Sequence, residues 1–130
     1  MNQSNKIKIS RNIIAVVDDL FFASKIRGTA EALGVSITFS RSVDSLIQAA
    51  TSEPPALIIC DLHATRIDPI ELSRRLKADD LLRSIRLLGF FSHVQTELQQ
   101  QAIQAGFDRV LPRSAFTNNL ARILSGQIEE

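Results

Sequence analysis

The sequence predicts an α/β fold in which a five-stranded parallel sheet carries helices on both faces. Segments with strand and helix patterns alternate along the chain from about residue 11 to residue 125. The runs at residues 13–17 and 57–60 are short, continuous and rich in Ile, Val and Leu. Such runs are typical of strands that are buried on both faces. Strands that alternate with helices imply right-handed crossovers and a single parallel sheet.

In the first half of the chain we expect strands at residues 13–17, 35–39 and 56–61, with a helix in each interval. Gly34 ends the first helix, Ser42 caps the second, and Glu53-Pro54-Pro55 breaks it. Apolar residues recur at helical spacing in both helices: Phe22, Ile26, Ala30 and Leu33 in the first, and Val43, Leu46, Ile47 and Ala50 in the second.

In the second half of the chain, the sequence predicts strands at residues 85–91 and 108–111 and three more helices. The first of these helices has a strong start, with Asp68 as N-cap, Pro69 at the first position and Glu71 at the third. A glutamine-rich helix runs from about residue 94 to residue 105 and ends at Gly106. The last helix spans residues 114–124, and its apolar face comprises Phe116, Leu120, Ile123 and Leu124.

The composition limits the class of protein. We expect one domain at residues 11–126, between a flexible polar tail at residues 1–10 and a C-terminal tail at residues 127–130. A net charge of +1 gives no electrostatic reason to expect nucleic acid or a membrane surface as partner. Cys60 is the only cysteine, which suits a reducing compartment, and no apolar run could span a bilayer. These features predict a cytoplasmic protein.

Three carboxylates follow two of the most apolar runs. Asp18 and Asp19 come directly after the first strand, and Asp61 closes the third. The carboxyl ends of parallel strands meet at one edge of the sheet, where ligands bind in such folds. Like charges gathered there repel one another unless a cation neutralises them, and a hard ion such as Mg²⁺ prefers carboxylates and water. The sequence therefore predicts a magnesium site at this edge.

The order of elements and the acidic positions together resemble the receiver domain of bacterial two-component response regulators. The resemblance covers about residues 11–125 and implies a flavodoxin-like, doubly wound fold. It also implies that Asp18, Asp19 and Asp61 bind Mg²⁺, together with the backbone carbonyl of His63. Asp61 would in addition accept a phosphoryl group, from a histidine kinase or a phosphotransfer protein, and the domain would signal to a downstream protein.

This chain differs from that family at two positions, the family's lysine and the hydroxyl residue at the end of the fourth strand. Counting seven residues from Gly106 places Arg113 where the family has lysine. Its planar guanidinium either clamps a phosphoryl group or pairs permanently with Asp61. The family's hydroxyl residue at the end of the fourth strand corresponds to Phe91, or to Ser92 after a slip of one residue. Ser92 also begins a capping-box pattern for the next helix, a role that we favour over a phosphate contact.

Three further positions depart from the family pattern. Val110 stands where the fifth strand usually has an aromatic residue, and our hypothesis is that Phe91 fills the space of that missing ring. In the loop after Asp61, Thr65 replaces a proline and Pro69 replaces a glycine.

Other classes of function find little support. The chain has no phosphate-cradling glycine loop and no nucleophile elbow. His63 and His93 are too few and too far apart in sequence to predict a zinc site with Cys60. We therefore expect no independent enzymatic activity. Five glutamines leave one helix almost uncharged, which makes homodimerisation a fair hypothesis: Gln95, Gln99, Gln100, Gln101 and Gln104.

We favour a stand-alone receiver domain of a phosphorelay, with a Mg²⁺-dependent phosphoacceptor at Asp61. The alternative is a pseudo-receiver, an interaction module that is not phosphorylated. In the alternative, Arg113 and the carboxylates form a permanent ion-pair network with a purely structural role.

Overall fold

The computed structural model describes residues 11–127 and has the predicted architecture. Five parallel strands form one sheet in the order β3-β2-β4-β5-β6. The strands are β2 (Asn12–Val16), β3 (Ser36–Phe39), β4 (Leu57–Asp61), β5 (Arg86–Phe91) and β6 (Arg109–Pro112). The helices are α1 (Leu20–Leu33), α2 (Val43–Ser52), α3 (Pro69–Lys77), α4 (Thr96–Ala105), α5 (Arg113–Asn118) and α6 (Leu120–Leu124). The predicted tail at residues 1–10 lies outside the described residues, as do residues 128–130 of the predicted tail at residues 127–130.

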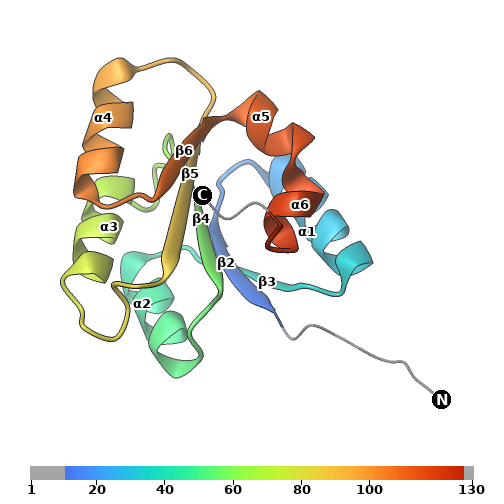
Figure 1. Cartoon of the computed structure of the whole chain (residues 1–130), viewed down its shortest axis with the longest axis horizontal. Helices are drawn as coiled ribbons and strands as arrows, with labels where there is room; N and C mark the ends of the chain where they lie inside the picture. The colour runs from blue at the N-terminus through green and yellow to red at the C-terminus, as the bar shows by residue number, and fades with distance from the viewer. Residues whose placement is uncertain (1–10, 128–130) are drawn as a thin grey trace.

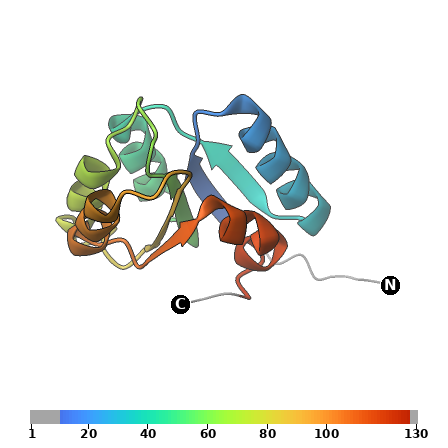
Figure 2. The ribbon, with the colours of Figure 1, turned by 90° about the horizontal axis from the view of Figure 1, so that it is seen from above.

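The sheet separates two hydrophobic cores. Helices α2, α3 and α4 cover one face, and α1, α5 and α6 cover the other (Figures 1 and 2). Alternate residues of β2 enter opposite cores, since Ile14 and Val16 pack with the first group of helices and Ile13 and Ala15 with the second. The central strands are therefore buried on both faces, as their unbroken apolar runs predict.

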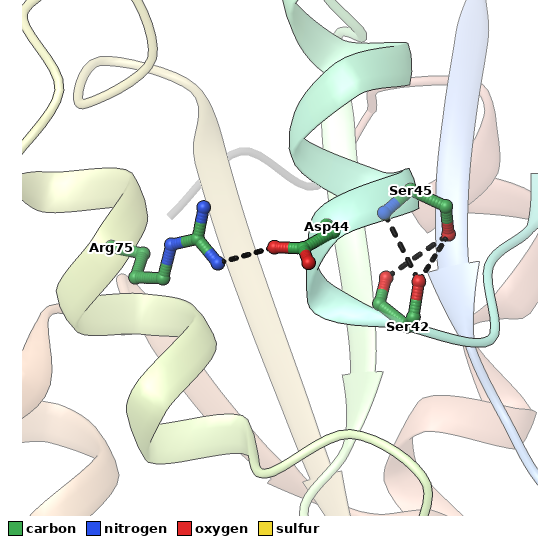
Figure 3. A network of polar contacts seen from close by, with 4 residues as sticks. All are labelled: Ser42, Asp44, Ser45 and Arg75. Carbon is green, nitrogen blue, oxygen red and sulfur yellow. Dashed lines mark hydrogen bonds and ion pairs between the residues drawn. The ribbon is translucent and has the colours of Figure 1, made fainter.

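Side-chain caps form at two of the predicted helix starts, those of α2 and α3. Asp68 accepts hydrogen bonds from the backbone N–H groups of Ile70 and Glu71 at the start of α3. Ser42 caps α2 by accepting from Ser45 N at 3.1 Å (Figure 3). Beside that cap, the exposed pair of Asp44 and Arg75 joins α2 to α3 at 2.8 Å. An exposed pair of this kind contributes little to stability, so both helices are held mainly by the core that they share on this face of the sheet.

Two predicted helices differ from the structure. The expected helix at residues 114–124 is divided into α5 and α6 at Asn119, whose side-chain amide donates to Ala115 O at 2.8 Å. A local bond of this kind competes with the helical backbone bonds. The predicted capping role of Ser92 is wrong, because α4 begins only at Thr96 and no side chain caps it. A capping residue must directly precede the first helical residue, and Ser92 lies four positions before it.

Smaller differences lie at the surface. Leu33, assigned to the apolar face of α1, is 42% exposed. Among residues 11–127 no helix is long and apolar enough to cross a membrane.

Candidate functional site

Asp61 lies at the carboxyl end of the central strand β4 and is only 8% exposed. Its Oδ1 accepts a hydrogen bond from His63 N at 2.9 Å. Within the described chain, no donor bonds to its other oxygen, Oδ2. Burial raises the pKa of this carboxyl, and the N–H and charge of His63 and the charge of Arg113 oppose the shift. Asp61 is thus a desolvated carboxylate with an oxygen free to react or to bind a cation.

Asp18 faces the same edge from the connection after β2. Its Oδ2 accepts two hydrogen bonds from Thr65, from the backbone N at 2.8 Å and from Oγ1 at 3.1 Å. Its negative charge also contributes to the raised pKa of Asp61, so the two carboxylates are electrostatically coupled. The contact joins the β2–α1 connection to the β4–α3 loop, and it holds Asp18 beside the end of β4.

Thr65 is a site residue that the sequence reasoning missed. A proline at this position has no N–H and no hydroxyl, so it could make neither hydrogen bond to Asp18. The replacement of the family's proline by threonine was the available signal in the sequence.

Asp19 has a different environment from Asp18. Its Oδ1 caps α1 by accepting from Phe21 N at 3.0 Å and Phe22 N at 3.1 Å. Its Oδ2 forms an ion pair with Arg113 Nη2 at 3.2 Å. The N–H of Phe22 and the guanidinium of Arg113 lower the pKa of this carboxyl. Both oxygens of Asp19 are therefore already engaged.

Arg113 begins α5 directly after β6 and is held from two sides. Besides pairing with Asp19, its guanidinium lies 3.8 Å from the centre of the Phe22 ring, a cation–π contact. The ion pair that the sequence left open, between Arg113 and Asp61, is thus replaced by one with Asp19. Phe22 was also missed as a site residue, because helical spacing assigns it only to the apolar core.

The ends of β4 and β5 bring other predicted residues together. Phe91 is 9% exposed and lies in the core beneath α3 and α4, with Val110 packed against the same cluster. That Phe91 takes the space of a missing ring stays a prediction. Ser92 follows in an exposed bend. The rings of His63 and His93 meet edge to face with centroids 5.5 Å apart, a contact that their separation in sequence did not predict.

The carboxylates fit a magnesium ion in part. Among residues 11–127, no three side chains of His, Cys, Asp or Glu gather closely enough to hold a metal ion. Asp18 Oδ1 and Asp61 Oδ2 nevertheless accept no hydrogen bond from the described residues. Mg²⁺ commonly uses one or two carboxylates and completes its coordination with water. The arrangement suits a two-carboxylate site, whereas Asp19 is available only if Arg113 releases it.

Comparisons with known proteins identify the fold. No protein-family model and no curated protein matches the chain. Among solved structures, the chemotaxis response regulator CheY4 of Vibrio cholerae aligns with a TM-score of 0.77 at 14% identity, over 92% of this chain and 99% of that one. The phosphorylated cyanobacterial phytochrome response regulator RcpA aligns with a TM-score of 0.74 at 17% identity, over 91% of each chain.

A third solved structure is the receiver domain of a sensor histidine kinase from Pseudomonas aeruginosa. It aligns with a TM-score of 0.72 at 18% identity, over 89% of this chain and 98% of that one. Its description records a magnesium ion coordinated in the active-site cleft. The chain therefore has the fold of response-regulator receiver domains.

Proposed function

We propose, on the basis of this receiver fold, that the chain is a phosphorelay receiver domain in which Asp61 accepts a phosphoryl group. One observation carries the proposal: the carboxylate that ends the central strand is buried, has a raised pKa and keeps Oδ2 free of donors. A structural carboxylate at such a depth normally has hydrogen bonds to both oxygens, because an unsatisfied buried charge is costly. The free oxygen indicates a reactive role.

The chemistry follows from this carboxylate. Asp61 Oδ2 attacks the phosphorus of a phosphoryl donor, the bond from phosphorus to the leaving oxygen or nitrogen breaks, and an aspartyl phosphate remains. A bound Mg²⁺ would neutralise the charge that develops on the phosphoryl oxygens. Asp18, Asp61 and the backbone carbonyl of His63 are the groups that would hold it. Arg113 and Ser92 are the candidate contacts for the phosphoryl oxygens.

The structural neighbours support a metal and a phosphoryl group at such a site. One is described as phosphorylated, one as having magnesium in its active-site cleft, and a third as the Mn²⁺-bound form of a response regulator. Those properties belong to the neighbours, and we extend them to this chain because its free carboxylate oxygens lie at the end of the corresponding strand.

The surface beside the site has exposed apolar side chains that suit signalling by contact with another protein. Leu20 and Phe21, at the start of α1 next to Asp19, are 77% and 91% exposed. Exposed apolar side chains of this size suit a partner that approaches Asp61, such as a histidine kinase or a phosphotransfer protein. On α4, Ile103 is 51% exposed among glutamines, and we keep homodimerisation or a downstream partner as the use of that face.

Incubation with acetyl phosphate and Mg²⁺, followed by intact mass measurement, tests the proposal. We expect the mass of one phosphoryl group to be added, and to be absent in Asp61→Asn and when Mg²⁺ is chelated. Asp80→Asn is the matched control, because Asp80 is an exposed acid on a distant loop, with a side chain 87% exposed. It should be phosphorylated as the wild type is. Modification that persists in Asp61→Asn would refute the proposal.

The pseudo-receiver is the second candidate, and the contacts of Arg113 favour it. An arginine held by both Asp19 and the Phe22 ring is poorly placed to release Asp19 to a metal. If the same incubation leaves the wild-type mass unchanged, the chain is an interaction module and the ion pair is structural.

A further inference from the structure

A pocket beside Asp18 is lined by three arginines from three parts of the chain. Its volume is about 110 Å³. Arg27 comes from α1, Arg41 from the connection between β3 and α2, and Arg66 from the loop between β4 and α3. The strands β3, β2 and β4 are neighbours and parallel, so the segments that follow them meet at one edge of the sheet (Figure 2).

Arg27 is positioned by an aromatic ring that lines the same pocket. Its guanidinium carbon lies 4.7 Å from the centre of the ring of Phe39, the last residue of β3. A cation–π contact of this kind orients a guanidinium over the face of the ring and uses none of its N–H groups as hydrogen-bond donors to oxygen. The guanidinium can therefore still donate to a ligand.

Arg41 and Arg66 are exposed, and neither is neutralised by a carboxylate. Within residues 11–127 the ion pairs use Arg75, Arg83 and Arg113, and none of the three arginines of the pocket takes part in one. Guanidinium groups without an acidic partner are suited to bind the oxygens of an anion with paired hydrogen bonds.

Asp18 is the only acid in the lining of the pocket. Its Oδ2 accepts two hydrogen bonds from Thr65, and no ion pair joins it to an arginine of the pocket. One carboxylate among three guanidiniums leaves an excess of two positive charges in the lining.

The described residues closest to the C-terminus lie at the other edge of the sheet. Arg11, directly before β2, donates from Nε to Leu124 O, and Gln127 N donates to Arg122 O, both at 2.8 Å. The pocket lies beside the residues that follow β2, and residues 1–10 contain no acid. The positive charge of the pocket is thus a property of its own lining.

We propose that this pocket binds the phosphate group of a small phosphate monoester. Such a group has three terminal oxygens and a negative charge of about 1.5–2 at neutral pH, which match three guanidiniums around one acid. A carboxylate has two oxygens and one charge, so it would leave one arginine without a partner. The volume of about 110 Å³ is several times that of a water molecule and admits a phosphate with a few further atoms, which contact Leu20 and Phe39.

Calorimetric titration of the whole chain with glycerol 3-phosphate, without Mg²⁺ and at an ionic strength of about 0.15 M, tests the proposal, because salt at this level screens general surface charge. We expect saturable binding of one equivalent. Glycerate, which has a carboxylate in place of the phosphate, should bind about tenfold more weakly or less, and glycerol should not bind. No saturable binding of glycerol 3-phosphate, or glycerate binding as tightly, would overturn the proposal.

Variants with the same change of charge locate the bound phosphate. Arg41→Gln and Arg66→Gln each remove an exposed guanidinium of the pocket and should weaken binding about fivefold or more. Arg122→Gln removes an exposed guanidinium of α6 that does not line the pocket, and it should leave the affinity unchanged. Affinities in Arg41→Gln and Arg66→Gln that equal that of Arg122→Gln would overturn the proposal.

The proposal does not depend on phosphorylation of Asp61, and one further variant separates the two sites. Arg113→Gln removes the candidate phosphoryl contact beside Asp61 but no residue of the pocket, so it should bind glycerol 3-phosphate as the wild type does. Binding that is lost in Arg113→Gln and kept in Arg66→Gln would place the phosphate at the site of Asp61 and refute the pocket as its binding site.

Discussion

Asp61 and Asp19 show how the environment of a carboxylate decides its role. Both lie at the carboxyl edge of the sheet, but their pKa values shift in opposite directions. Burial raises the pKa of Asp61, whereas the N–H of Phe22 and the guanidinium of Arg113 lower the pKa of Asp19. The carboxylate of Asp19 is therefore stabilised as an anion and has a structural role. The ionised form of Asp61 is destabilised by burial, and a bound cation would stabilise it.

Replacing Asp61 with asparagine should stabilise the fold at neutral pH. A folded-state pKa raised above the unfolded value means that the native state is penalised once Asp61 ionises. The stabilising effect of Asp61→Asn should thus be absent below about pH 4, the unfolded pKa of an aspartate, and should develop as the pH rises through the folded pKa. We expect on the order of 1 kcal/mol, a common size for a single substitution, from urea unfolding at pH 3.5 and pH 7.5. A variant that is less stable than the wild type at pH 7.5 would contradict this explanation.

Replacing Arg113 with glutamine should strengthen Mg²⁺ binding severalfold. The substitution removes the ion pair at 3.2 Å and frees an oxygen of Asp19, and it also removes a positive charge that repels the metal. Calorimetric titration with MgCl₂ measures the effect, with Arg122→Gln as a control for net charge. If Mg²⁺ affinity is the same in both variants, Arg113 does not restrict the site.

At the scale of single elements, local patterns located the starts of α2 and α3 but missed the break between α5 and α6 and the late start of α4. The cap at Asp68 depends on neighbouring residues, so a local pattern is enough to find it. The break at Asn119 depends on a side-chain hydrogen bond to Ala115 O. The helical spacing of apolar residues continues across the break, so the sequence pattern does not indicate it. The late start of α4 was missed in the same way. The predicted helix begins at about Val94, but α4 begins at Thr96 and Val94 is 79% exposed before it.

Two glycines should respond in opposite ways to alanine. A Cβ at Gly89 in β5 would lie 3.0 Å from both Leu62 Cδ2 and Phe107 Cδ2. Gly89→Ala should therefore lower the free energy of unfolding by about 1–3 kcal/mol through overpacking. A Cβ at Gly28 in the exposed part of α1 would meet nothing within 4 Å. Gly28→Ala should raise the free energy of unfolding by about 0.5–1 kcal/mol, because alanine restricts the unfolded chain.

Urea unfolding of both variants measures the two effects under the same conditions. A stabilising Gly89→Ala would contradict the close approach of Leu62 and Phe107 to Gly89.

At the scale of the whole molecule, the sheet topology determines which charges meet. The sequence predicted that Asp18 and Asp61 share an edge, because the ends of buried parallel strands coincide. The pseudo-receiver alternative joined Arg113 to the carboxylates as a group but did not single out Asp19, since that contact requires the cap of α1 and the ring of Phe22 to be in place. Nor did the sequence predict the three arginines of the pocket beside Asp18, which the order of β3, β2 and β4 brings together.

Locating the residue that carries the phosphoryl group is the measurement that tests the central claim most directly. After incubation with acetyl phosphate and Mg²⁺, borohydride converts an aspartyl phosphate to homoserine, and peptide mass spectrometry then locates the change. We predict homoserine at position 61 and at no other acidic position. Homoserine at Asp18, Asp19 or Asp68 with Asp61 intact, or no conversion at all, would contradict the assignment of Asp61 as phosphoacceptor.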